Sequence, residues 1–196
     1  MHVGILIYHQ VNELEAVAPL AVLATAKRLL DGAADTPEVE VSTVARSRFS
    51  VQTSGGLTVT PAWAFASAPA FDVLIVPGGP GVDRAQRDGA LRSYFETRVP
   101  QIDRLVSISA GALILGAFGL LRNERVAAHA AVHERLEAFE VAGVSASGLV
   151  RNDRIWSAAS AYEASEVAVE LLIERFGDGI AARVDAFLSG KADIGP

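Results

Sequence analysis

The apolar positions of the chain follow two different periods. Continuous apolar runs at residues 3–8, 71–76 and 105–108 are typical of strands buried on both faces of a parallel sheet. Alternating apolar and polar residues predict another strand at 39–45. Between and after these strands, apolar residues at helical spacing predict helices at 15–30, 89–97, 110–121, 132–139, 162–176 and 179–188.

Shorter elements fill the gaps between these segments. The stretch "TSGGLTVT" predicts a glycine turn and a short strand, residues 126–128 predict a short strand, and residues 149–157 predict a hairpin around "RNDR". Strands and helices alternate without a linker, a repeat or a low-complexity segment. This order predicts an α/β fold, a three-layer sandwich around a mostly parallel central sheet, in a single domain over residues 1–196.

Three loops follow strands of this predicted sheet and carry candidate chemistry. They are "HQVNELEA", "PGGPGV" and "ISAGA". Ligands of open parallel sheets bind beyond the carboxyl ends of the strands, where such loops meet. We therefore expect a small-molecule site built from these three loops.

Composition removes several function classes. The net charge is −6 and no stripe of Lys and Arg occurs, which predicts no nucleic-acid partner for these residues. No apolar run reaches the roughly 18–20 residues of a membrane helix. The opening "MHVGILIYHQ" lacks the basic segment and cleavage site of a signal peptide. We expect a cytoplasmic protein without a membrane partner.

Metal and cofactor sites are not predicted either. The chain has no cysteine, which excludes disulfides, thiolate metal ligands and thiol catalysis. Of its four histidines only His129 and His133 share a helical spacing, and no HExxH pattern is present. The phosphate-binding patterns GxGxxG and GxxxxGK[ST] are also absent, so no cofactor is expected and a flavin or nucleotide binder is disfavoured.

Ser109 is the first candidate for chemistry. In "SISAG" a strand passes through small residues into a helix, which is the arrangement of a nucleophile elbow, where a strained residue presents its side chain. Serine is also a favoured N-cap residue, because its oxygen accepts from free N–H groups of the first helical turn. Both roles are compatible with the sequence.

Other candidates lie in the same three loops. Gly78 and Gly79 in "PGGPG" form either a cradle for an anion or a tight turn. Glu15 either complements the helix dipole or faces the other two loops as an acid. His129 is either structural or catalytic, and His133 is expected on a solvated helix face.

Taken together, these motifs resemble the ThiJ/PfpI superfamily, which has the flavodoxin-like, class I glutamine-amidotransferase-like fold. The resemblance covers nearly the whole chain, through "VGILIYHQVNELEAVAPLAVLATA", "DVLIVPGGPGVD", "LVSISAGALILGAFGLLRNERVAAHAAVHERL" and "AASAYEASEVAVELLIERF". The isocyanide-hydratase-like members look most similar, through "QVNELEAVAPLAVLA" and "GAFGLL".

The resemblance implies a role for each matching residue. Ser109 falls on the nucleophile, Glu15 on its acidic partner and His129 on the nearby histidine. The N–H groups of Gly79 and Ala110 fall on the oxyanion-stabilising pair, with Gly78 in the same turn. Glu166 falls near a position that is often acidic in the hydratase-like members. The superfamily also usually forms homodimers, which implies a homodimer here.

The chain departs from the family pattern at several positions. The nucleophile is cysteine in the family and serine here, and a hydroxyl needs a general base that a thiolate does not. The next position, often threonine in hydratases, is Ala110, and Ala18 stands where glycine often precedes the proline. The glycine-rich late loop reads "AASAYEAS", where Tyr162 and Glu163 are expected to add bulk near a substrate.

These features leave several hypotheses open. The preferred one is a ThiJ/PfpI-like protein whose site is altered, with weak or absent hydratase, glyoxalase or amidase chemistry. An active isocyanide hydratase or hydrolase using Ser109, or a water activated by Glu15, is the alternative. A ligand sensor of an AraC-type regulator is a third hypothesis, which requires a helix-turn-helix domain beyond "SGKADIGP". The serine is either natural or a laboratory replacement; the other departures favour the former.

Overall fold

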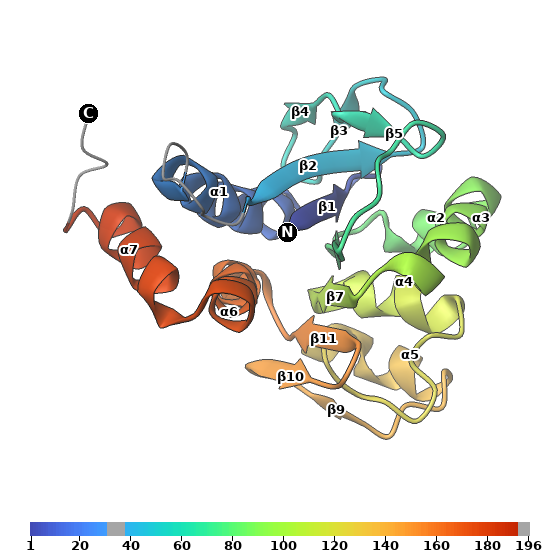
Figure 1. Cartoon of the computed structure of the whole chain (residues 1–196). Helices are drawn as coiled ribbons and strands as arrows, with labels where there is room; N and C mark the ends of the chain where they lie inside the picture. Colours follow the sequence, from blue (N-terminus) through green and yellow to red (C-terminus); the bar gives the residue numbers. More distant parts are fainter. Residues whose placement is uncertain (31–37, 192–196) are drawn as a thin grey trace.

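The computed structural model describes residues 1–30 and 38–191 of the chain. At its centre is a seven-stranded sheet with the strand order β10-β11-β7-β6-β1-β2-β5 (Figure 1). Neighbouring strands are parallel except β10 and β11, which form the expected hairpin. The strands are β1 (His2–Leu6), β2 (Glu40–Ala45), β5 (Trp63–Ala64), β6 (Val73–Val76), β7 (Arg104–Ile108), β10 (Leu149–Arg151) and β11 (Ile155–Ala158).

Two small ribbons lie outside this sheet. Strands β3 (Val51–Gln52) and β4 (Thr58–Val59) pair antiparallel across the glycine turn. Strands β8 (Arg125–Ala127) and β9 (Gly143–Ser145) pair in parallel. Four short 3-10 turns also occur in the described residues, at Val99–Gln101, Ser109–Gly111, Ala130–Val132 and Ala161–Glu163.

Helices cover both faces of the sheet, as Figure 1 shows. One hydrophobic core joins the sheet to α1 (Glu13–Leu30), α6 (Ala164–Phe176) and α7 (Asp178–Leu188). A second core joins the opposite face to α2 (Val82–Ala85), α3 (Gly89–Arg98), α4 (Ala112–Ala117) and α5 (His133–Glu137). Neighbouring residues Ile5 and Leu6 are both fully buried in different cores, which explains the continuous apolar run of β1. The predicted three-layer α/β fold is confirmed.

The apolar stretch 110–121, predicted as one helix, is shorter than expected. It begins with the 3-10 turn Ser109–Gly111, continues as α4 and ends at Ala117. Two N–H groups close the end, Leu120 to the Leu115 carbonyl at 3.0 Å and Gly119 to the Gly116 carbonyl at 2.9 Å. With Gly119 at φ 77°, this is a Schellman stop, which outweighs the apolar composition of the stretch.

Other predicted helix boundaries also move at 3-10 turns. The α-helical part of 162–176 begins at Ala164, and that of 132–139 spans His133–Glu137. Helix α1 begins two residues earlier than predicted, because the Asn12 side chain accepts from the Leu14 N–H at 3.0 Å. Strands β5 and β9 and helix α2 are too short to show a period in the sequence, and they were not expected.

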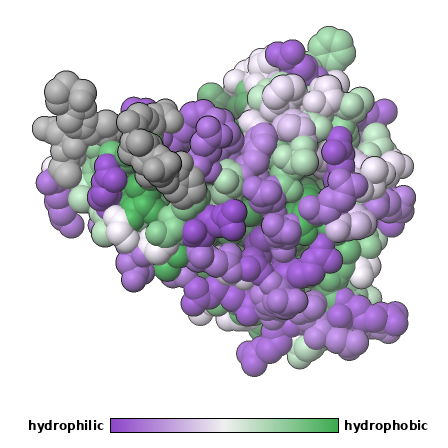
Figure 2. Space-filling view, viewed as in Figure 1, coloured by the Kyte–Doolittle hydropathy of each residue, from purple (hydrophilic) through white to green (hydrophobic). Residues whose placement is uncertain are grey.

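The surface of the molecule is mixed in polarity. Figure 2 shows hydrophilic side chains over much of the face that carries β9, β10 and β11, with hydrophobic groups in scattered places. Among the described helices, none is both long enough and apolar enough to span a bilayer.

Candidate functional site

The loops after β1 and β6 lie against each other at the carboxyl edge of the sheet. The Asn12 N–H donates to the Gly78 carbonyl at 2.9 Å, and the Gly81 N–H donates to the Gln10 carbonyl at 3.1 Å. A β-carbon built on Gly79, at φ 124°, lies only 2.4 Å from the Asn12 nitrogen. Glycine is required here both by backbone conformation and by close approach.

Ser109 follows β7 and has the strained backbone that an elbow requires. Its φ is 56°, in the left-handed region, although it is not glycine. The side chain is only 7% exposed. A non-glycine residue in this region costs about 1–3 kcal/mol, which the surrounding packing must offset. The cap position of the following turn is Ile108, so Ser109 is the first residue of the turn rather than its N-cap.

Glycine after Ser109 permits the tight turn. A β-carbon built on Gly111 lies 2.1 Å from the carbonyl oxygen of Val76, at the end of β6. One built on Gly78 lies 2.8 Å from the Ala110 nitrogen and 2.9 Å from Glu15 Oε2. The glycine loop after β6 therefore presses directly against the start of the Ser109 turn.

Glu15 lies on the first turn of α1 and is buried, with 2% of its surface exposed. Its Oε2 accepts the Gly78 N–H at 2.5 Å, and its Oε1 accepts the Asn12 amide at 3.1 Å. Burial raises the pKa of Glu15 to about 7, against the opposing effect of hydrogen bonds from Gly78, the Ser109 side chain and Asn12. A carboxyl group with a pKa of about 7 changes its protonation near neutral pH, and the Ser109 side chain lies close enough to Glu15 to influence that pKa.

Backbone donors complete the site. The Gly78 N–H is used by Glu15 and is not free for a ligand. Within residues 1–30 and 38–191, no protein acceptor binds the N–H groups of Gly79 or Ala110. The Ala110 N–H belongs to the 3-10 turn Ser109–Gly111, and the Gly79 N–H belongs to the glycine loop. Backbone donors of this kind suit a carbonyl oxygen or an anion.

Tyr8 is a member of this region that the sequence reasoning missed. Its hydroxyl donates to the Pro77 carbonyl at 2.7 Å, immediately before the glycine pair. Burial, and secondarily the charge of Glu15, raises the pKa of the Tyr8 phenol. Its position at the end of the first predicted strand was the available signal, because strand ends point into this edge of the sheet.

His129 is engaged in the cap of a neighbouring turn. It is exposed, and its Nδ1 accepts the Ala131 N–H at 3.2 Å as a cap of the next turn. A neutral ring in this bond carries its proton on Nε2. In the described part of the chain, no hydrogen bond or ion pair joins His129 to Ser109 or Glu15.

His133 supports the His129 loop rather than facing solvent. Its expected place on a solvated helix face is wrong, because the ring is half-buried and Nε2 lies 2.8 Å from the Ala128 carbonyl. On the other side, the Ser157 hydroxyl accepts the Ala127 N–H at 2.7 Å. These two contacts fix the backbone that leads to His129.

The late loop differs from the expectation of bulk near the substrate. Tyr162 is 89% exposed and points to solvent. The Glu163 carboxylate accepts the Gly148 N–H at 2.8 Å and the Ser160 N–H at 2.6 Å, in a capping box with Ser160. The Glu163 side chain is therefore accounted for by the loop itself. Glu166 is exposed in the first turn of α6.

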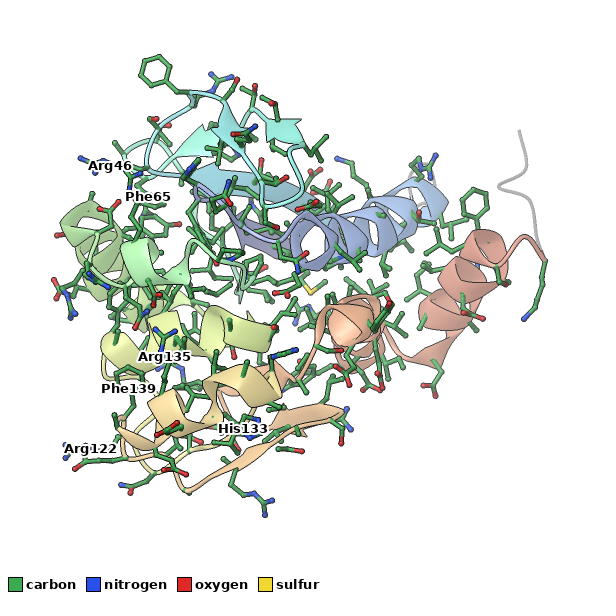
Figure 3. All side chains as sticks on the ribbon, turned by 180° about the vertical axis from the view of Figure 1, so that it is seen from behind. Arg46, Phe65, Arg122, His133, Arg135 and Phe139 are labelled. Atoms are coloured by element: carbon green, nitrogen blue, oxygen red, sulfur yellow. The ribbon has the colours of Figure 1, made fainter. Side chains whose placement is uncertain are left out.

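Figure 3 shows all described side chains, with His133, Arg135 and Phe139 labelled on and beside α5. Arg135 forms an ion pair with Asp83 of α2, which joins α5 to the helix after the glycine loop.

Among the described residues, no group of three or more His, Asp and Glu side chains is placed to hold a metal ion.

Comparisons with known proteins now define the family. The model of the DJ-1/PfpI family matches residues 1–174. An isonitrile hydratase of Pseudomonas putida is 32% identical over 136 residues, which are 69% of this chain and 55% of the relative. The chain thus spans about half the length of that curated relative.

Solved structures agree on the fold. A ThiJ/PfpI family protein from Pseudomonas syringae superposes with a TM-score of 0.86 at 21% identity, over 98% of this chain and 76% of the other. Drosophila melanogaster DJ-1beta superposes with a TM-score of 0.82 at 16% identity, over 96% and 97% of the two chains. By sequence and by architecture, this chain belongs to the DJ-1/PfpI family.

Proposed function

We propose that this chain holds a small-molecule ligand at the Ser109 elbow and that its hydratase, glyoxalase or amidase chemistry is weak or absent. One observation carries the proposal. Ser109 is held at φ 56° beside buried Glu15, at a site that keeps the strained elbow but offers a hydroxyl instead of a thiol.

The chemistry of the neighbours supports weak catalysis. A serine hydroxyl becomes a nucleophile only when a base takes its proton. With a pKa of about 7, Glu15 is largely protonated below neutrality and then donates rather than accepts. His129 is engaged as a cap, and within residues 1–30 and 38–191 no hydrogen bond joins it to Ser109. These groups are well suited to hydrogen-bonding a polar ligand, with the Gly79 and Ala110 N–H groups holding its oxygen.

An active hydratase is the second candidate, favoured by the similarity to the Pseudomonas putida isonitrile hydratase. Above pH 7, Glu15 is largely ionised and is a base either for a water molecule or for the Ser109 hydroxyl. Addition of that water to an isocyanide R–NC gives the formamide R–NH–CHO. The water oxygen bonds to the terminal carbon, and its two protons end on carbon and nitrogen.

The test compares the natural chain with Ser109→Ala and Ser109→Cys against isocyanides, α-oxoaldehydes and activated esters. We expect turnover only in Ser109→Cys, because the scaffold is intact and a thiolate needs no base. Turnover by the natural chain that Ser109→Ala abolishes would establish a serine nucleophile and reject the proposal. Turnover retained in Ser109→Ala and lost in Glu15→Gln would establish the water mechanism.

Methylglyoxal is the substrate that tests for glyoxalase activity most directly. Below pH 7 the natural chain is expected to leave methylglyoxal unchanged over hours, because the chain has no cysteine and Glu15, with a pKa of about 7, is then largely protonated. Lactate formation by the pure protein would contradict the proposed weak site, and Ser109→Cys serves as the positive control for a functional scaffold.

A homodimer is proposed as the assembled form. Leu14 and Val17 on α1 are 46% and 43% exposed, and Leu57 in the β3–β4 hairpin is 49% exposed. The two elements are joined, since Glu13 accepts from the Ser54 hydroxyl at 3.1 Å and the Gly55 N–H at 3.0 Å. Light scattering should give about twice 20.6 kDa, and Val17→Asp should lower it; a mass of 20.6 kDa for the natural chain would reject the dimer.

The remaining expectations concern the cell. We propose a cytoplasmic location, to be tested by fractionation of the source cells.

The regulator hypothesis requires a DNA-binding domain on the same natural polypeptide, which mass spectrometry of the protein isolated from its source would detect.

A further inference from the structure

A cavity lies at the carboxyl ends of β1 and β2, on the side of α2 and α3. Its volume is about 170 Å³. Its apolar wall is formed by Leu6, Ala45, Val51, Phe65, Ala85 and Leu91. Ser109, Glu15 and the Gly78–Gly79 pair do not line it. A cavity of about 150 Å³ with apolar walls accommodates a benzene ring, so this one has room for a single small ring or branched alkyl group.

The rim of the cavity is cationic. Arg46 and Arg84 line it, and Figure 3 shows Arg46 beside Phe65 where β2 ends. The carboxylate of Asp88, the acidic residue of the lining, already has partners within the protein. Its Oδ1 accepts the Ala90 N–H at 2.8 Å and the Leu91 N–H at 3.3 Å, and its Oδ2 lies 3.5 Å from Arg46.

Arg84 is the unmatched charge of this rim. Within the described ranges it has neither an ion pair nor a side-chain hydrogen bond. The carboxylate one residue away, Asp83, is paired with Arg135. Arg87 adds another positive charge in the adjoining hollow, which Arg46 and Arg84 also line. The rim therefore has an excess of guanidinium groups over free carboxylates.

We propose that this cavity is a binding site for a small organic anion, a carboxylate attached to one compact apolar group. The apolar group occupies the pocket between Val51, Phe65 and Leu91. The carboxylate remains at the rim, where a guanidinium fork matches its geometry. Arg84 supplies that fork, because it is not engaged elsewhere. The site is separate from the chemistry proposed for Ser109.

The position of the cavity connects it to the Ser109 region. Tyr8 and Gly81 both line the cavity. The Tyr8 hydroxyl donates to the Pro77 carbonyl, and the Gly81 N–H donates to the Gln10 carbonyl. A ligand in the cavity therefore contacts the two loops that carry Glu15 and the glycine pair.

Benzoate is the probe that tests this proposal, and benzyl alcohol is its neutral counterpart. Binding to the purified chain is measured by calorimetry, and two-dimensional NMR shifts locate the ligand. We expect benzoate to bind at millimolar concentrations or below and to shift resonances of Val51, Phe65 and Leu91. Ser109→Ala should bind it equally, which separates this proposal from the one for Ser109.

Two variants and one control sharpen the test. Arg84→Gln should weaken benzoate about three- to fivefold, as for an exposed ion pair, and leave benzyl alcohol unchanged. Arg84→Lys should recover only part of the loss, because it keeps the charge without the guanidinium fork. Val51→Phe, which fills the cavity, should weaken both ligands at least tenfold. Arg48→Gln, an exposed arginine outside the cavity lining, should change neither.

Several outcomes would overturn the proposal. They are no benzoate binding at concentrations tenfold above the expected millimolar range, NMR shifts centred on Ser109, or equal losses of benzoate affinity in Arg84→Gln and Arg48→Gln. Unchanged binding in Val51→Phe would also reject the cavity. Arg84 and Arg48 are exposed, so folding of their variants is checked simply by comparing their thermal unfolding with that of the natural chain.

Discussion

Two strands of this protein run into 3-10 turns in the same way, and only one produces a strained residue. After β7, Ser109 takes φ 56° and is almost fully buried. After β8, His129 takes φ −58° and ψ 136° and is exposed. Ser109 stands between Ile108 and Ala110, and His129 stands between Ala128 and Ala130. The neighbouring residues do not explain why only one of the two backbones is strained.

The difference comes from what each turn meets. The Ser109 turn is pressed between the Val76 carbonyl and the Gly78 loop, and its side chain is close enough to Glu15 to affect the pKa of that carboxyl. The His129 turn is held by its own cap bond and by the Ala128 N–H, which donates to the Ser145 carbonyl at 3.0 Å. His133 and Ser157 support it from behind. A strained backbone persists only where surrounding structure holds it from several sides.

The largest expected effect tests this confinement. Gly111→Ala should lower the free energy of unfolding by about 3 kcal/mol, because the new methyl group meets the Val76 carbonyl oxygen. The backbone itself suits alanine, with φ −58° and ψ −26°. Gly143→Ala, in β9 on the other side of the comparison, has no atom within 4 Å and should change stability by less than about 0.5 kcal/mol. Urea unfolding measures both, and equal losses would show that the elbow is not confined.

The burial of Glu15 predicts a pH dependence on the Ser109 side alone. Its folded pKa of about 7 lies above the unfolded value of 4.5, so the folded state holds the proton more tightly. Stability is therefore fully present below pH 4.5 and falls as the pH rises to about 7, by about 3 kcal/mol in total. Urea unfolding between pH 4.5 and 7.5 should show this slope relative to Glu15→Gln. Parallel curves for the two proteins would contradict the raised pKa.

Backbone strain at Ser109 predicts a smaller effect, in which glycine stabilises the protein relative to alanine. Ser109→Gly and Ser109→Ala both remove the hydroxyl, but only glycine relaxes at φ 56°. Ser109→Gly should therefore be more stable than Ser109→Ala by about 1 kcal/mol. At Ser107, inside β7, the order should reverse, since glycine weakens a strand. Thermal unfolding of the four variants decides this, and an unchanged order at the two positions would reject the strain.

The smallest effect is expected at His129. His129→Ala removes a cap acceptor and should cost about 0.5 kcal/mol, while His129→Asn keeps an acceptor and should cost less. In the Ser109→Cys background, His129→Ala should reduce turnover less than tenfold, because no recorded contact joins the ring to Ser109. A loss of a hundredfold or more would place His129 in the chemistry and remove the contrast between the two turns.

The layered fold follows from the residue pattern alone, because continuous apolar strands and amphipathic helices leave few other ways of burying their surfaces. The residue pattern also singled out the three loops that carry Glu15, Gly78 and Ser109, since the carboxyl ends of parallel strands share one edge. Helix ends were less predictable: the stop at Ala117 depends on the left-handed Gly119, and apolar composition does not report it.

The chemical environment of the candidate groups depends on contacts between distant parts of the chain. The tertiary structure buried Glu15 and so moved its pKa, turned His129 into a cap, brought Tyr8 against Pro77 and opened a cavity between β1, β2 and α3. Periodicity along the chain reports which face of an element is buried, whereas the electrostatics of a site depend on groups distant in sequence. For this protein the pattern of residues was sufficient for the fold, and the long-range contacts were needed for the chemistry.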